Sequence, residues 1–202
     1  YTFKQALASL LSAAAAAGTP VVVLDRPTPL AHLGSLGPVS RQFFPLPLPV
    51  VIPYTMGELA LLLNAKLGRQ ADLTVLPLED WTRSEAWPRT TLPWIPPSPN
   101  IPTLDAAYAY LAAGVVQATN ISEGRGTTKP FEYIGAPFLE AATLRAELRA
   151  AALPGVQWRD LFFRPMFNKY AGETCAGVQL IMQSPREYRP ILTQLHLLRA
   201  LA

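Results

Sequence analysis

The sequence is poor in the residues that build disulfide, metal and redox sites. Among 202 residues it has one cysteine, Cys175, and two histidines, His32 and His196. A disulfide framework and a thiolate zinc site are therefore excluded, and a histidine-rich metal site is not expected. We predict no metal ion and no cofactor. Because neither histidine is obviously placed to act as a base for Cys175, we expect a small buried thiol rather than a nucleophile.

Charge is also scarce. Lysine and arginine number 17 and aspartate and glutamate 14, so the net charge is +3, and no run of basic residues marks a nucleic-acid binder. The longest uncharged apolar run, residues 6–23, is broken by Gly18 and Pro20. It falls short of the ~20 apolar residues that span a bilayer, so no transmembrane segment is expected. A Gly-x-Ser-x-Gly elbow and a Walker loop are absent as well.

Proline, by contrast, is abundant. The 21 prolines are roughly twice the ordinary share of about 5%. They lack a Gly-x-y period and cluster in two stretches, 27–53 and 88–102, which predicts a proline-rich connector and a long ordered loop. The second stretch contains Trp94, and a loop of this size is usually functional when aromatic residues argue against disorder.

The first residues read as a helix followed by a strand. Residues 3–17 are rich in alanine and leucine and end at Gly18, a natural C-terminal cap. The β-branched run 21–24 predicts a buried, parallel strand, as in the last unit of an α/β domain. Apolar spacing and capping signals predict further helices at 58–67, 104–113, 139–151 and from 184 onward, and strands at 73–76, 131–134, 156–163 and 178–182. The fold class is therefore α/β or α+β.

The densest polar stretch runs from Asn120 to Lys129, with a glycine on each side of Arg125. A guanidinium can hold a carboxylate through two parallel hydrogen bonds, and glycines let the backbone approach a ligand closely. Five residues of this stretch are candidate site residues: Asn120, Ser122, Glu123, Arg125 and Thr127. The alternative is a surface turn whose charged side chains are merely solvated.

A second candidate is Asp25-Arg26, which follows the first predicted strand. Open α/β sheets bind ligands at the carboxyl ends of their strands. The alternative is a buried ion pair that fixes the loop. Trp81, Trp87 and Trp94 either form a wall that stacks on sugar rings or fill the core beneath the proline-rich loops.

An ordered set of short motifs spans essentially the whole chain. The motifs are Val22–Pro27, Gly37–Pro38, Tyr54–Ala60, Trp81–Arg83, Trp94–Thr103, Thr119–Thr127, Pro130–Glu132, Gly135–Pro137, Phe167–Lys169 and Gly172–Cys175. In this order they resemble the exo-β-N-acetylmuramidases of the NamZ type, bacterial peptidoglycan glycosidases formerly described as a domain of unknown function.

The resemblance implies a Rossmann-like domain followed by a smaller mixed α/β domain. It places the end of the Rossmann-like domain and the connector at residues 1–54, and the family core with a truncated C-terminal domain at 55–202. The implied activity is release of terminal N-acetylmuramic acid from the non-reducing end of peptidoglycan fragments such as a muramyl disaccharide, as in bacterial cell-wall recycling. An extracytoplasmic location, secreted or periplasmic, is implied as well.

The resemblance together with the chemistry of the side chains predicts roles for particular residues. The main catalytic glutamate is expected upstream of Tyr1, so the chain is expected to be an internal fragment that is inactive alone. Glu123 and Asp25 are expected to support catalysis, facing one hollow together with Arg125, which is expected to contact the lactyl carboxylate. The expected substrate-binding residues are Asn120, Ser122, Arg125, Thr127, Arg26, Trp94 and Asn100.

The chain departs from the family pattern at Thr28, Gln117 and Tyr170, which bears on substrate detail. Two alternatives to an enzyme stay open: a non-catalytic module that binds cell-wall saccharides, and a structural domain that docks on a catalytic partner. Oligomeric state is not encoded in any motif.

Overall fold

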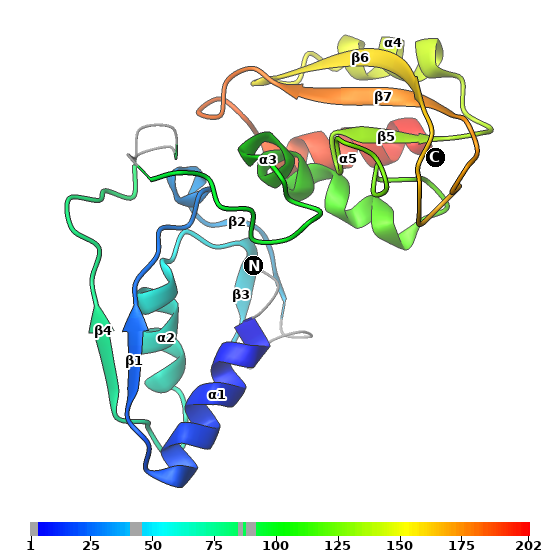
Figure 1. Ribbon diagram of the computed structural model, residues 1–202. Helices are drawn as coiled ribbons and strands as arrows, with labels where there is room; N and C mark the ends of the chain where they lie inside the picture. Colours follow the sequence, from blue (N-terminus) through cyan, green and yellow to red (C-terminus); the bar gives the residue numbers. More distant parts are fainter. Residues whose placement is uncertain (1–3, 41–45, 85–86, 88–91) are drawn as a thin grey trace. The chain divides into compact units, whose positions relative to one another are not determined.

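The computed structural model describes residues 4–40, 46–84, 87 and 92–202 and forms two compact units, Tyr1–Thr91 and Leu92–Ala202 (Figure 1). The domain division expected at residue 54 stays a prediction; the compact units divide later because residues 56–64 and 73–76 pack with residues 21–24 in the first unit. Within the described residues, no helix combines the length and the apolarity needed to cross a bilayer.

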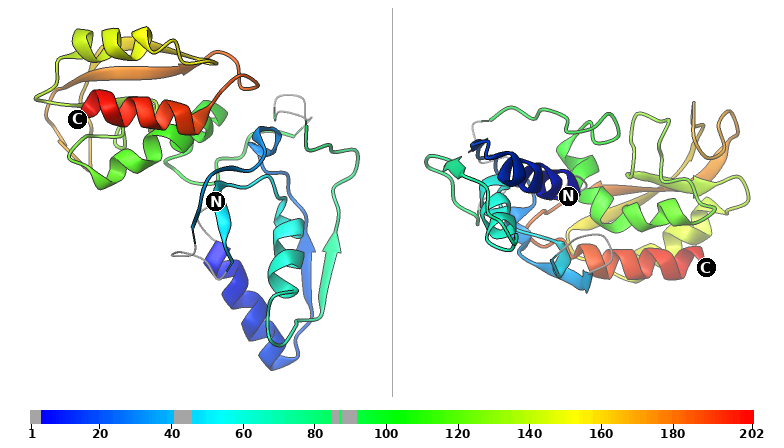
Figure 2. Two further views of the ribbon diagram at one scale, coloured as in Figure 1. Left: turned by 180° about the vertical axis from the view of Figure 1, so that it is seen from behind. Right: turned by 90° about the horizontal axis from the view of Figure 1, so that it is seen from below.

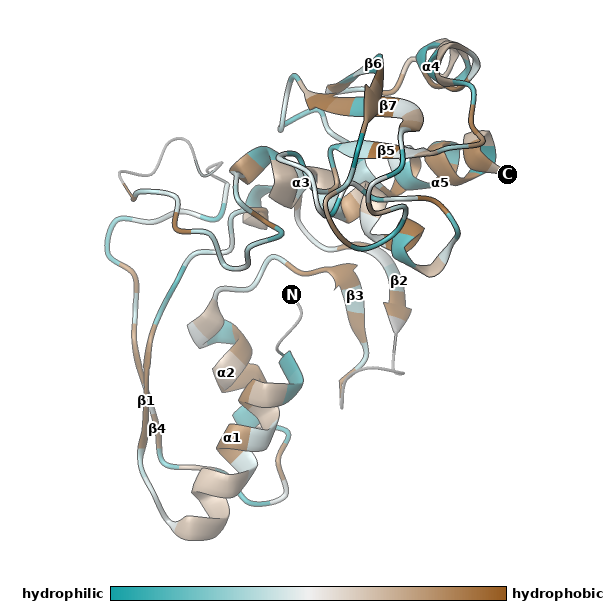
Figure 3. Ribbon diagram, turned by 45° about the vertical axis from the view of Figure 1, so that its right-hand side comes forward, coloured by the Kyte–Doolittle hydropathy of each residue, from teal (hydrophilic) through white to brown (hydrophobic). Residues whose placement is uncertain are grey.

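Among its described residues, the first unit contains α1 (Lys4–Ala17), β1 (Val21–Leu24), η1 (Ala31–Leu33), β2 (Leu36–Ser40), β3 (Leu48–Val51), α2 (Met56–Asn64) and β4 (Leu73–Leu76). β1 and β4 pair in parallel, from Val21 opposite Leu73 to Leu24 opposite Leu76. The predicted strands at 21–24 and 73–76 and the parallel arrangement are thus confirmed. In Figure 3 both strands are coloured mainly as apolar.

Helices α1 and α2 lie on one side of the β1–β4 pair (Figures 1 and 2). Their buried residues, among them Leu11, Leu59 and Leu63, pack with the inward-facing Val21 and Val23. Alternate residues point the other way, so Val22 is 60% and Leu24 68% exposed. Within this chain, the predicted burial of β1 is therefore found on its inner face, while its outer face is exposed.

The segment predicted to be a connector, residues 27–53, contains two paired strands that its proline content did not predict. β2 and β3 pair antiparallel, with Leu36 opposite Val51 and Ser40 opposite Leu48. Proline is tolerated in such a two-stranded pair because each strand has an edge that needs no N–H donor. The interpretation of this segment as a plain connector is therefore wrong.

The second unit contains α3 (Leu104–Ala113), η3 (Gly114–Ala118), β5 (Tyr133–Ala136), α4 (Ala141–Ala150), β6 (Val156–Phe163), β7 (Cys175–Met182) and α5 (Pro190–Leu201). Its three strands form an antiparallel sheet in the order β5-β7-β6. α4 packs on β6 and β7, while α3 packs on β7 and α5. Tyr108 of α3 and Tyr188, which precedes α5, are fully buried, and the Tyr188 hydroxyl donates to the Tyr108 carbonyl.

The N-caps predicted at Thr55 and Thr103 are confirmed, whereas the N-cap predicted at Ser184 and several predicted bounds are wrong. The strand predicted from 178 begins at Cys175, and the helix predicted at 58–67 is Met56–Asn64. Thr55 forms the predicted capping box with Glu58, and Thr103 accepts from the Ala106 N–H. The strand predicted from 131 begins at 133, since Phe131 has φ 64° and cannot extend the ladder. The helix predicted from Ser184 begins at Pro190, because residues 184–188 close a turn on the Ser184 carbonyl.

Candidate functional site

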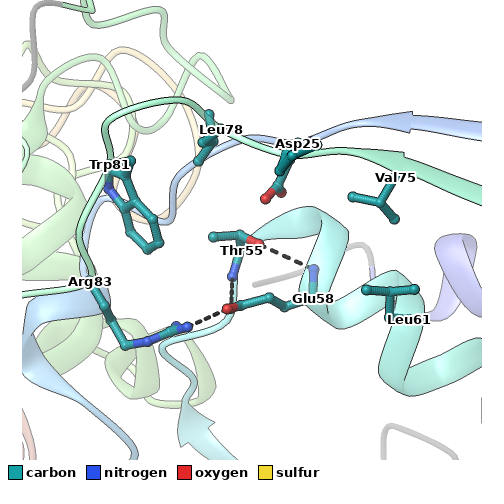
Figure 4. A pocket seen from close by; sticks show the side chains of 9 residues that line it. Asp25, Thr55, Glu58, Leu61, Val75, Leu78, Trp81 and Arg83 are labelled. Carbon is teal, nitrogen blue, oxygen red and sulfur yellow. Dashed lines mark hydrogen bonds and ion pairs between the residues drawn. The ribbon is translucent and has the colours of Figure 1, made fainter.

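A pocket of about 400 Å³ opens at the carboxyl ends of β1 and β4 (Figure 4). The residues that line it all belong to the first unit: Asp25, Thr55, Glu58, Leu61, Val75, Pro77, Leu78, Trp81 and Arg83. This is the position at which parallel sheets present ligand-binding side chains, as the sequence predicts for Asp25.

Asp25 is held by backbone N–H groups rather than by a cation. Its Oδ1 accepts from Gly57 N at 2.6 Å and from Arg26 N at 2.8 Å. Gly57 is required there, because a Cβ at this residue would lie 2.5 Å from Val75 Cγ1 and 2.9 Å from Asp25 Cγ. Arg26 is exposed, and no ion pair between it and Asp25 forms among the described residues. The alternative of a buried Asp25–Arg26 ion pair is therefore wrong.

The floor of the pocket is an ion pair anchored to the start of α2. Thr55 N donates to Glu58 Oε2 at 2.9 Å, and Arg83 donates to Glu58 Oε1 and to the Pro53 carbonyl. The Arg83 guanidinium lies 5.7 Å from the Trp81 ring centroid. Burial alone would raise the pKa of Glu58, but the hydrogen bonds from Arg83 and Thr55 outweigh it and lower the pKa. Glu58 therefore stays charged at neutral pH.

In the second unit, Glu123 is the centre of a buried polar cluster. Its side chain is 1% exposed, and Arg125 contacts Oε1 at 2.5 Å while Lys169 contacts Oε2 at 3.3 Å. Asn168 adds a donor 3.3 Å from Oε1. The Lys169 ammonium also donates to the carbonyls of residues 116, 117 and 121. Glu123 is thus not a solvated residue of a surface turn.

Arg125 is itself engaged within this cluster. Its second terminal nitrogen donates to Gln117 Oε1 at 2.7 Å, and the guanidinium lies 4.9 Å from the centroid of the Phe131 ring. Phe131 holds that position with a positive φ, which is rare for a bulky residue. These contacts fix the orientation of the guanidinium; its predicted contact with a substrate carboxylate stays a prediction.

The smaller polar residues of this stretch bond to the turn itself. Ser122 Oγ accepts from Gly124 N at 3.2 Å, and the Thr127 hydroxyl donates to the Gly124 carbonyl at 2.6 Å. The Asn120 carbonyl accepts from the Tyr170 hydroxyl at 2.5 Å, while the Asn120 residue is exposed. Their predicted ligand contacts stay predictions, but their observed bonds explain the shape of the turn.

A second loop, residues 164–174, completes the cluster. Met166 N donates to the Gly126 carbonyl at 2.8 Å, and a Cβ at Gly126 would lie 2.4 Å from the Phe167 carbonyl oxygen. The contribution of Asn168 and Lys169 was not predicted from the local chemistry, because they contact Glu123 across 45 and 46 residues. Their only signal in the sequence is the short motif at 167–169.

The remaining predicted site residues lie elsewhere. Trp94 is half-buried and donates to the Pro102 carbonyl at 3.1 Å, and Asn100 N donates to Ser98 Oγ. Both belong to the second unit, whereas Trp81, Trp87, Asp25 and Arg26 belong to the first. The common tryptophan wall and the hollow shared by Asp25 and Arg125 therefore stay predictions.

Cys175 begins β7 and is fully buried. Burial raises the pKa of its thiol, with a further contribution from the negative charge of Glu173. The thiol is therefore protonated at neutral pH, which matches the sequence-based expectation of a small buried residue. Among the residues that the structure describes, no group of three or more metal-ligating side chains occurs.

Comparison with known proteins adds three relatives. Two family models match the chain. The model of the N-terminal domain of exo-beta-N-acetylmuramidase NamZ matches residues 1–105, and the model of its C-terminal domain matches residues 108–202. The peptidoglycan beta-N-acetylmuramidase NamZ of Bacillus subtilis (strain 168) is 39% identical over 206 residues, covering 100% of this chain and 50% of that protein.

Two crystal structures of DUF1343 family proteins from Bacteroides fragilis NCTC 9343 share the mixed α/β fold. One, at 29% identity and a TM-score of 0.92, covers 100% of this chain and 54% of its own. The other, also at 29% identity, has a TM-score of 0.69 and covers 91% of this chain and 49% of its own. The chain thus spans about half the length of the relatives it matches.

Proposed function

Because this chain belongs to the exo-beta-N-acetylmuramidase NamZ family, we propose that the full-length protein is a glycoside hydrolase that releases terminal N-acetylmuramic acid from the non-reducing end of peptidoglycan fragments. The observation that carries the proposal is the consecutive match of both family domains along nearly the whole chain, supported by 39% identity to a peptidoglycan beta-N-acetylmuramidase. The activity is proposed for the full-length protein, since the chain spans half of that relative. The chain alone is expected to be inactive.

The two acidic candidates have different chemical capacities. Glycoside hydrolysis usually needs an acid that protonates the leaving oxygen and a second group at the anomeric carbon. Both oxygens of Glu123 are bonded to cations, so this carboxylate is suited to positioning Arg125 and Lys169 rather than to giving up a proton. Asp25 has one oxygen anchored by two N–H groups and lines a pocket. Neither replaces the catalytic glutamate expected outside this chain.

The finer fold proposal is that β1 and β4 belong to a larger, Rossmann-like parallel sheet. Parallel sheets are normally covered on both faces. Here α1 and α2 cover one face, while Val22, Leu24 and Leu76 leave the other face apolar and at least half exposed. We also propose an extracytoplasmic location, because intact peptidoglycan lies outside the cytoplasmic membrane.

We expect the full-length protein to release N-acetylmuramic acid from a disaccharide that carries muramic acid at its non-reducing end. The release is measured by chromatography with mass detection. The control substrate has N-acetylglucosamine at the non-reducing end, and an exo-acting muramidase leaves it intact. Binding of the disaccharide without release would instead favour a saccharide-binding module, and equal cleavage of both substrates would contradict the proposal.

Replacing Arg125 with alanine in the full-length protein is expected to lower kcat/KM by about 30-fold, or about 2 kcal/mol, because one partner of a charge pair is lost. Arg149→Ala, on the exposed side of α4, is the control. A substrate whose lactyl carboxylate is methylated distinguishes two roles of Arg125: direct contact with that carboxylate, or only the pairing with Glu123. If Arg125 contacts the carboxylate, Arg125→Ala abolishes the preference for the acid over the ester. Unchanged turnover in Arg125→Ala would show that neither role applies.

A further inference from the structure

The pocket of the first unit combines an aromatic face with anchored polar groups. Figure 4 shows the Trp81 indole on one side and the Asp25 carboxylate directed toward the space above Thr55, with the Glu58–Arg83 pair forming the floor. Trp81 is half-buried and its ring contacts the Arg83 guanidinium, which restricts the ring. A volume of about 400 Å³ lies within the range of pockets that bind small molecules.

Asp25 presents a hydrogen-bond acceptor to this pocket. Gly57 N and Arg26 N both bond to Oδ1, so the side chain cannot rotate without losing two hydrogen bonds. No hydrogen bond to Oδ2 forms among the described residues. An ionised carboxylate only accepts, so Oδ2 is matched to a ligand that donates, such as a sugar hydroxyl or an amide N–H.

The charge of the lining side chains disfavours an anionic ligand. Two carboxylates, Asp25 and Glu58, line the pocket together with one guanidinium, Arg83. Arg83 already donates to Glu58 and to the Pro53 carbonyl. The side chains therefore carry a net charge of about −1 and repel a second carboxylate.

We propose that this pocket binds an uncharged pyranose, with the Trp81 indole against the C–H face of the ring and Asp25 Oδ2 accepting from a hydroxyl. In the substrate of the proposed function, on which this assignment of the sugar rests, the uncharged ring is N-acetylglucosamine. The anionic muramic acid is then bound elsewhere. Trp81 and Asp25 are substrate-binding residues in this proposal, and Glu58 and Arg83 position Trp81.

The test follows the Trp81 indole N–H by NMR in the full-length protein, with the resonance assigned by its loss in Trp81→Phe. N-acetylglucosamine is expected to shift this resonance in a saturable way, and N-acetylmuramic acid is expected to do so at least tenfold more weakly. Asp25→Asn keeps an acceptor for the two backbone N–H groups and places a donor where Oδ2 was. It is expected to weaken N-acetylglucosamine binding at least tenfold.

Asp72→Asn, an exposed residue just before β4, is the matched control and should leave binding unchanged. The proposal is overturned if N-acetylglucosamine leaves the indole resonance unmoved, if Asp25→Asn binds as tightly as the wild type, or if muramic acid binds more tightly here. Release of muramic acid is measured separately. Release without an indole response defeats the pocket assignment alone, while an indole response without release defeats the proposed function alone.

Discussion

Replacing Glu123 with alanine is expected to lower the free energy of unfolding by about 3 kcal/mol, the low end of the cost of breaking a buried ion pair. The carboxylate is 1% exposed and is the shared counter-charge of Arg125 and Lys169, whose side chains are only 22% and 24% exposed. Without it, two like charges face one another across a space from which water is largely excluded. The remaining exposure of both cations keeps the cost from being larger.

Urea unfolding of the full-length protein, followed by circular dichroism, measures this loss. Glu173→Ala is the control, because Glu173 is exposed and lies on the same loop as Lys169. Glu123→Gln keeps one acceptor oxygen and is expected to lose less stability than Glu123→Ala. A loss below about 1 kcal/mol in Glu123→Ala would show that the cluster does not depend on this carboxylate.

Gly126→Ala is expected to lower the free energy of unfolding by about 3 kcal/mol through two separate costs. The first is the positive φ of 84°, which costs an L-residue about 1–2 kcal/mol. The second is steric, because the new Cβ would lie 2.4 Å from the Phe167 carbonyl oxygen and 2.8 Å from its amide nitrogen. Relieving these overlaps requires the turn at residues 120–129 and the loop at residues 164–174 to move apart.

Gly172→Ala is the matched control for this prediction. Gly172 has a nearly equal φ of 80°, but a Cβ there meets nothing within 4 Å. Gly172→Ala should therefore show only the conformational cost of about 1 kcal/mol. Equal losses of stability in the two variants would mean that the loops move apart freely and that the close approach at Gly126 has no energetic consequence.

The candidate site was predictable in part. A glycine-flanked arginine next to an acid marks the Glu123 turn, and the end of a β-branched strand marks Asp25. The partners were not predictable from local chemistry, because Lys169 contacts Glu123 from 46 residues away and Gly57 contacts Asp25 from 32. Trp81 and Arg83 were visible as a motif, but only the fold places both at one pocket with Asp25.

The sequence by itself determined several of the local elements and the family, but not the β2–β3 pair. The strands at 21–24, 73–76 and 156–163 and the caps at Thr55 and Thr103 follow from short apolar, β-branched runs and from side-chain capping, which act over a few residues. Only the tertiary structure decided how these elements pair. It also decided that Glu123 is buried between two cations, and that Asp25 is anchored by backbone amides with one oxygen facing a pocket. Those outcomes depend on contacts between distant segments, whose selection is a property of the packed chain and not of any short stretch.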